Sequence, residues 1–214
     1  MKQLTIYERA LWGILVVVII GVIALWSWKS LSEKNNSVTT KSLRMPVNDF
    51  SLLDQYGNTV SKKSLEGDIV IANFIFTNCA GSCPIMTTKL LELYQMFKYE
   101  NNVRFLSLSV DPEQDSVEVL RRFAEGYGVG PNHQYPDSTR WLFLTGAKEE
   151  IVRLCREDFK LAFYEEGGTP EEYIVHSSKF VLLNRKTEIT NYFDSDDEEK
   201  MKELYLTVRS LLKE

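Results

Sequence analysis

Residues 68–86 read DIVIANFIFTNCAGSCPIM, and this stretch decides the fold. Residues 68–76 form a continuous apolar run with β-branched side chains, which is typical of a strand buried on both faces. Two cysteines follow, Cys79 and Cys83, and Pro84 comes directly after the second. Proline disfavours helical backbone at the residue before it but suits the first position of a helix. The pattern therefore predicts a buried strand, a loop containing Cys79, and a helix that begins at Pro84 with Cys83 at its cap.

Strands and helices alternate on both sides of this unit. Upstream, a hairpin is expected over 49–61 with its turn at 56–58. Downstream, the apolar patterns predict helices at 84–98, 115–128, 147–157 and 196–213, strands at 103–110 and 141–146, and a hairpin of 179–184 and 188–193. Two parallel crossovers and one antiparallel hairpin indicate an α/β fold with a mixed sheet, compatible with a thioredoxin-like arrangement.

The N-terminal part differs in composition from the rest. Residues 10–28, ALWGILVVVIIGVIALWSW, carry no charge and are long enough to cross a bilayer as a helix. A cleaved signal peptide would have a shorter apolar region followed by a small-residue cleavage site, so an uncleaved anchor is favoured. The predicted organisation is a short segment at 1–9, a transmembrane signal anchor at 10–28, a polar tether at 29–45 and one folded domain at 46–214. Basic residues flank the span on both sides, so charge alone does not fix its orientation.

The chain of 214 residues has a formal net charge of -5, which argues against a nucleic-acid-binding protein. The two thiols leave four interpretations open: packing, a structural disulfide, a redox couple or a metal site. Their position at a strand-to-helix turn favours reactivity, because open α/β sheets place their sites at the carboxyl ends of strands. The helix N-terminus is expected to lower the pKa of Cys83 toward the thiolate, the form that binds soft metals or attacks disulfides.

Two other residues, His176 and Asp111, are candidates for the same site, whereas His133 and Cys155 are not. His176 lies directly before the predicted strand at 179–184, and two thiolates with one imidazole form a ligand set suited to copper. Asp111, in the loop after the strand at 103–110, is a possible additional ligand. His133 is expected in a surface loop, and Cys155 is expected to be a buried apolar residue of a helix.

Four segments resemble the Sco/SenC family, membrane-anchored proteins that help assemble the copper centre of cytochrome c oxidase. They are NFIFTNCAGSCPIM, SVDPEQDSVEVLRRFAEGYG, WLFLTGAKEEI and YIVHSSKFVLLN, in the family's order. The resemblance implies a thioredoxin-like fold that binds one copper ion, Cu(I) or Cu(II), through Cys79, Cys83 and His176. It also implies that Asp111 belongs to a recurrent segment near the site.

The same resemblance implies partners and a location. A copper chaperone of this family would deliver its ion to the copper-centre subunit of cytochrome c oxidase. A thiol reductant protein would keep its cysteines reduced, because copper loading requires reduced thiols. The protein would be a single-pass protein of the inner membrane, with its soluble domain on the extracytoplasmic, periplasmic side.

Two positions depart from the family's pattern. The family commonly has a proline after the first cysteine, where this chain has Ala80, and this change should loosen the loop. Many members have an aspartate before the histidine, where this chain has Val175, so one group that could orient the imidazole is absent. Neither departure removes a copper ligand.

The main alternative is a membrane-tethered thiol–disulfide oxidoreductase that uses Cys79 and Cys83 to reduce cysteines of the oxidase or of another extracytoplasmic protein. Redox members of the fold generally carry CxxC and a cis-proline before the facing strand. This chain has CxxxC, and it has His176 followed by two serines at the proline's expected place. Both differences favour a metal site. A thiol peroxidase is disfavoured because no arginine lies near either cysteine in the sequence.

Overall fold

The computed structural model describes residues 12, 15, 18–23, 44–131, 140–161, 164–165, 173–174 and 178–214. The chain divides into two compact units, Met1–Lys41 and Ser42–Glu214. The described residues of the first unit are helical. No helix among the residues described here has the length and apolar character needed to cross a membrane. Most of the predicted anchor at 10–28 lies outside the described residues, so the anchor stays a prediction.

The second unit is built on a mixed sheet of six strands within the described part of the chain. Their order across the sheet is β1 (Met45–Pro46), β10 (Glu188–Asp194), β9 (Lys179–Leu183), β4 (Ile69–Ile75), β5 (Val103–Ser109) and β6 (Trp141–Leu144). Strands β4, β5 and β6 are parallel, whereas β9 runs antiparallel to β4 and β10 runs antiparallel to β9. The predicted α/β architecture with a mixed sheet is confirmed.

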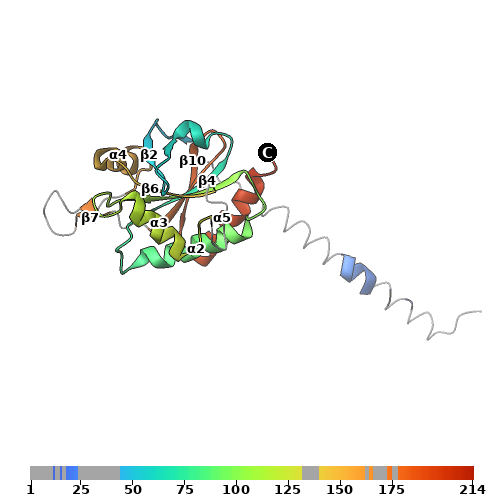
Figure 1. Cartoon of the computed structure of the whole chain (residues 1–214). Coiled ribbons are helices and arrows are strands. Elements are labelled where there is room, and N and C mark those ends of the chain that lie inside the picture. Colours follow the sequence, from blue (N-terminus) through green and yellow to red (C-terminus); the bar gives the residue numbers. More distant parts are fainter. Residues whose placement is uncertain are drawn as a thin grey trace, which may run out of the picture. The chain divides into compact units, whose positions relative to one another are not determined.

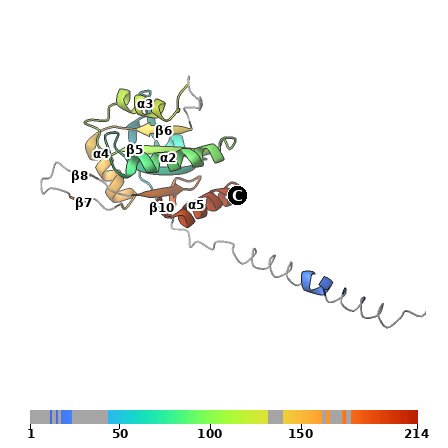
Figure 2. The same cartoon turned by 90° about the horizontal axis from the view of Figure 1, so that it is seen from below.

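Helices cover both faces of this sheet (Figures 1 and 2). One face packs against α2 (Ser82–Met96), α3 (Val117–Gly126) and α5 (Glu198–Leu211). The other packs against α4 (Lys148–Arg153), the π-helix η2 (Leu154–Asp158), the short helix η1 (Lys62–Leu65) and the hairpin of β2 (Ser51–Leu53) and β3 (Thr59–Ser61). A further hairpin, β7 (Tyr164–Glu165) with β8 (Tyr173–Ile174), was not predicted from the sequence.

Strand β4 is the most fully enclosed part of the sheet that positions the cysteines. All seven of its residues are buried. Ile69, Ile71 and Ile75 pack on the face covered by α2, α3 and α5, and the alternate residues pack on the other face. Full burial of one such aliphatic side chain contributes about 1.5–3 kcal/mol. The loop that carries Cys79 therefore starts from a strand held firmly on both sides.

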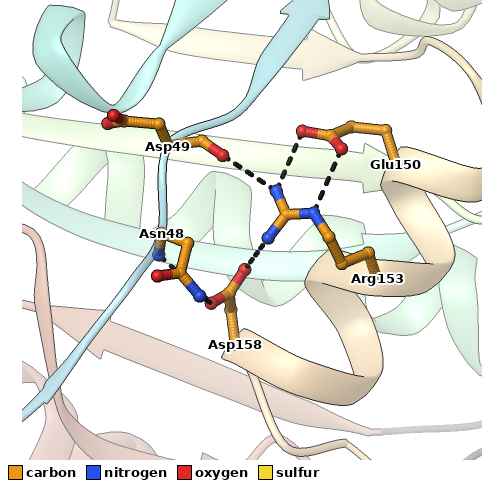
Figure 3. A network of polar contacts seen from close by, with 5 residues as sticks. All are labelled: Asn48, Asp49, Glu150, Arg153 and Asp158. Carbon is orange, nitrogen blue, oxygen red and sulfur yellow. Dashed lines mark hydrogen bonds and ion pairs between the residues drawn. The ribbon is translucent and has the colours of Figure 1, made fainter.

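The helix expected at 147–157 changes character partway along. It is α-helical as α4 and then continues as η2, where the Phe159 N–H donates to the Leu154 carbonyl five residues earlier at 2.8 Å. In this wider turn the Arg153 guanidinium reaches the Asp158 carboxylate at 2.8 Å. Figure 3 shows that Arg153 also binds Glu150 and the Asp49 carbonyl, while Asn48 donates to Asp158. This network joins the start of the folded unit to the end of η2.

Candidate metal centre

The two cysteines lie where β4 ends and α2 begins. Cys79 is in the connecting loop and half-buried, and Cys83 is in the first turn of α2 and only 6% exposed. Both thiols are free of disulfide bonds. The Cys83 thiol also donates a hydrogen bond toward the Cys79 sulfur. The two thiols therefore lie close together at this junction.

The predicted start of the helix at Pro84 is wrong by two residues. Helix α2 begins at Ser82, with Gly81 as its N-cap, so Cys83 is inside the helix. The first N–H groups of any helix lack an intrahelical acceptor, so the missing N–H of a proline at the third position costs no hydrogen bond. The Thr87 hydroxyl donates to the Cys83 carbonyl at 2.8 Å and supports this first turn. These local gains outweigh the steric preference that proline imposes on the residue before it.

The Cys79 thiol is the more acidic of the two. Partial burial raises its pKa, but hydrogen bonds from the backbone and side chain of Cys83 and from the backbone of Gly81 and Ser82 lower it more. The Gly81 N–H, for example, donates to the Cys79 sulfur at 3.4 Å. The pKa of Cys79 therefore lies below its ordinary value of 9.0, which favours the thiolate.

The Cys83 thiol behaves in the opposite way. Burial, together with the neighbouring Cys79 sulfur and the Asp115 carboxylate, raises the pKa of Cys83 to about 12. The expectation that the helix N-terminus would lower the pKa of Cys83 is therefore wrong. Removal of the thiol from water outweighs the partial positive charge of the first turn. The structure thus pairs a half-buried, more acidic thiol with a buried, protonated one.

A buried aspartate holds the loop that leads to Cys79. Asp115 is 1% exposed and its carboxylate accepts hydrogen bonds from the Thr77 N–H at 3.0 Å and the Thr77 hydroxyl at 2.5 Å. It also accepts one from the Ser109 hydroxyl at 2.6 Å. Asp115 thereby ties the end of β5 to the loop two residues before Cys79.

Sequence reasoning did not assign this role to Asp115. Nor does Asp115 cap α3: the cap is Ser116, whose hydroxyl accepts a hydrogen bond from the Val119 N–H. The sequence feature that could have indicated this role was the pair of aspartates, Asp111 and Asp115, after a buried strand. Such a pair meets the neighbouring strand's loop only if the two parallel strands are adjacent, as β4 and β5 are.

Asp111 lies in the β5–α3 loop and is partly buried. Burial raises the pKa of its carboxyl group, and the nearby Asp115 and Glu113 charges raise it further, against a hydrogen bond from Gln114. Among the described residues, no group of three or more His, Cys, Asp or Glu side chains is close enough to hold a metal ion. Asp111 is therefore not placed as a ligand together with both cysteines.

The two histidines, His133 and His176, lie outside the described residues, so their predicted roles stay predictions. The structure does describe the chain from Ser178, two residues after His176. Because β9 is antiparallel to β4, its first residue, Lys179, lies at the sheet edge where β4 ends and the cysteine loop begins. Cys155 is fully buried, as predicted, and burial raises the pKa of its thiol.

Comparisons with known proteins agree with the sequence resemblance. The family model described as SCO1/SenC matches residues 39–213. The SCO1 protein homolog of Bacillus subtilis is 37% identical over 143 residues, which are 66% of this chain and 69% of that protein. The mitochondrial SCO2 homolog of Bos taurus is 31% identical over 193 residues, 84% of this chain and 68% of that protein.

Solved structures give the same picture of the fold. BsSco, described as a member of the Sco family of cytochrome c oxidase assembly proteins with a disulfide switch, superposes with a TM-score of 0.67 and 32% identity. The match covers 81% of this chain and 97% of that one. Yeast Sco1, solved with copper bound, superposes with a TM-score of 0.59 and 25% identity over 79% of this chain and 90% of that one.

Proposed function

The chain belongs to the SCO1/SenC family, and on that premise we propose that it is a copper chaperone for cytochrome c oxidase assembly. One copper ion, the cargo, would bind to Cys79, Cys83 and His176. The observation that carries the proposal is the pair of adjacent, disulfide-free sulfurs at the junction of β4 and α2. A relative with a similar fold, yeast Sco1, has been solved with copper bound.

The chemistry of the two sulfurs suits a soft metal ion. Thiolates select Cu(I), and the addition of an imidazole also allows Cu(II). Cys79 is accessible and acidic, so it would make the first contact with an incoming ion. Cys83 must lose its proton to become a ligand, so copper binding would release a proton from this buried thiol. Asp115 holds the loop in place during this step through its hydrogen bonds to Thr77.

The N-terminal part of the chain would attach the protein to the membrane, and the folded unit would pass copper to a recipient. Residues 10–28 would anchor the protein in the inner membrane and residues 29–45 would act as a tether. The folded unit would lie on the extracytoplasmic side, where a thiol reductant protein keeps its cysteines reduced. The recipient would be the copper-centre subunit of cytochrome c oxidase, to which the ion passes by exchange of ligands.

A second function is favoured by the asymmetry of the thiols. An accessible, acidic Cys79 beside a buried, protonated Cys83 is the arrangement needed for thiol–disulfide exchange. The Cys79 thiolate would attack a disulfide of the oxidase or another protein, form a mixed disulfide and release one thiolate. Cys83 would then lose its proton and attack the Cys79 sulfur, which releases the second thiol and leaves a Cys79–Cys83 disulfide. An external thiol reductant would have to restore the dithiol.

Copper stoichiometry and visible absorption of the reduced full chain in detergent test the main proposal. The wild type should bind about one copper ion and show thiolate-to-Cu(II) charge-transfer bands. His176→Ala should lose these bands and Cu(II) binding. Since the chain has two histidines, His133→Ala is the matched control and should retain both.

Three results would contradict parts of the proposal. Tight Cu(II) binding with unchanged bands in His176→Ala would remove His176 from the ligand set. Unchanged copper binding in Cys79→Ser would remove the cysteine pair. Rapid reduction of insulin disulfides by a protein that binds no copper would replace the chaperone with the oxidoreductase.

A further inference from the structure

A lysine on the cysteine-bearing helix contacts the turn that follows β10. Lys89 lies in α2, six residues after Cys83, and its ammonium group donates a hydrogen bond to the Ser195 carbonyl. Ser195 is fully buried and lies between the end of β10 and the start of α5. Lys89 therefore connects the helix that begins at the cysteines to the turn that follows β10.

Ser195 continues the connection to the start of β9. Its N–H donates to the Ser178 carbonyl at 2.7 Å. The Ser178 hydroxyl in turn donates to the Asp194 carboxylate at 3.2 Å. Ser178 is thus held through both its backbone and its side chain. It is the first described residue after His176, and only Ser177 stands between them in the sequence.

Asp194 is itself fixed by several donors. Its carboxylate accepts from the Asp196 N–H at 3.2 Å and pairs with the Lys179 ammonium at 3.4 Å. The Asp196 N–H, with smaller contributions from Ser178 and Lys179, lowers the pKa of Asp194 below its ordinary value. The carboxylate is therefore charged at neutral pH and keeps accepting the Ser178 hydroxyl.

We propose that Lys89, Ser178 and Asp194 are positioning residues: they fix Ser178, at the start of β9, relative to the cysteine-bearing helix, and the proposed ligand His176 precedes Ser178 by two residues in the sequence. This rests on the proposed copper site and deepens it, because none of the three is offered as a ligand. The bridge runs from Lys89 through Ser195 to Ser178, and Asp194 locks its far end. A short rigid path suits a Cu(II) site. The affinity of the protein for Cu(II) is higher when the ligand distant in sequence is already held near the two sulfurs, because binding then costs less conformational entropy.

The proposal predicts different effects on the affinities for Cu(II) and Cu(I). Cu(I) is satisfied chiefly by soft thiolates, and both sulfurs come from the loop and helix that the bridge does not shape. Cu(II) also needs the nitrogen ligand, whose position the bridge would set. Weakening the bridge should therefore lower Cu(II) affinity about tenfold and shift the charge-transfer bands, and should change Cu(I) affinity much less.

The experiment compares Lys89→Met with Lys200→Met in the reduced full chain in detergent. Lys200 is an exposed lysine that pairs with Glu203 on α5, so its substitution removes a lysine contact away from the bridge. Lys89→Met and Asp194→Asn should each weaken Cu(II) binding about tenfold. Lys89→Arg should restore it, because guanidinium also donates to a carbonyl. In copper-free protein, hydrogen exchange of the Ser195 N–H should be faster in Lys89→Met than in the wild type, and unchanged in Lys200→Met.

The outcomes distinguish this inference from the proposed function. If the wild type binds copper and Lys89→Met matches Lys200→Met in Cu(II) affinity and absorption, the bridge has no positioning role. Equal losses of Cu(I) and Cu(II) affinity would point to general destabilisation and would also overturn it. If the wild type binds no copper, the proposed function itself fails, and the inference falls with it.

Discussion

Asp115 and Asp158 are two buried carboxylates that the fold satisfies in different ways. Asp158, 3% exposed, pairs with the Arg153 guanidinium at 2.8 Å and accepts from the Asn48 amide at 2.7 Å. Asp115, 1% exposed, accepts only from the neutral groups of Thr77 and Ser109 within the described part of the chain. The charge of Asp158 is matched by a cation, whereas that of Asp115 meets only neutral donors in the part of the chain that the structure describes.

The contact of Asp158 is therefore structural, whereas the charge of Asp115 acts on the cysteine site. A guanidinium beside Asp158 compensates its charge where it lies, at the end of η2. Among the described residues the carboxylate of Asp115 meets only neutral donors, and its field reaches Cys83 and adds to the burial that raises the pKa of that thiol. Burial and this charge together favour the protonated form of the Cys83 thiol.

Replacement of Asp115 should have the largest effect. Asp115→Ala leaves the Thr77 N–H and the Ser109 hydroxyl without their acceptor and should lower the free energy of unfolding by about 2–4 kcal/mol. Urea unfolding of the reduced protein measures the loss. Asp196→Ala, at an exposed aspartate, is the control. A loss no larger than that of the control would mean that the hydrogen bonds of Asp115 do not hold the loop.

The isosteric variant Asp115→Asn tests the charge separately. It keeps an oxygen acceptor and should lose less stability, about 1–2 kcal/mol. With the negative charge gone, the pKa of Cys83 should fall from about 12, and its alkylation should begin at lower pH. An unchanged pH profile of Cys83 alkylation would show that burial alone protects this thiol.

The next prediction concerns Asp158, the carboxylate paired with a cation. Arg153→Met removes the cation from a buried Asp158 and should lower the free energy of unfolding by about 1–3 kcal/mol, because the Asn48 hydrogen bonds remain. The alkylation profiles of Cys79 and Cys83 should stay as in the wild type. A shift of either profile would mean that the two carboxylates are coupled, contrary to the comparison.

The contrast also marks what the sequence could predict. Apolar runs and turn residues predicted the mixed sheet, because burial patterns and breakers are local signals. The adjacency of Thr77 and Asp115 depends on β4 lying beside β5, and no local pattern records which neighbour a carboxylate will meet. The π-helix η2 was likewise missed, since the Arg153–Asp158 contact that accompanies it spans five residues, whereas the neighbours expected on an α-helix are three or four residues apart.

At the candidate site, too, the sequence predicted some features, and others depended on the tertiary structure. The proximity of Cys79 and Cys83 followed from their spacing at a strand-to-helix turn. The pKa order of the two thiols did not, because it depends on which sulfur is buried by the rest of the domain. The proline after Cys83 predicted a later helix start, but in the structure Cys83 itself lies inside the helix. Local rules located the reactive thiols, whereas their electrostatics needed the tertiary structure.

The smallest effect is expected from the acid titration of Glu150, the second carboxylate that Arg153 binds. Hydrogen bonds from Arg153, at 2.9 and 3.1 Å, hold the pKa of Glu150 below its ordinary value of 4.5. The unfolded chain therefore binds the proton more readily than the folded one. The contribution of this pair to stability is present above pH 4.5 and is lost as the pH falls through the lower folded-state pKa. Because Glu150 is partly exposed, solvent screening limits it to less than about 1 kcal/mol. Unfolding free energies of wild type and Glu150→Gln should differ at neutral pH and converge in acid, whereas a constant gap would attribute the effect to packing.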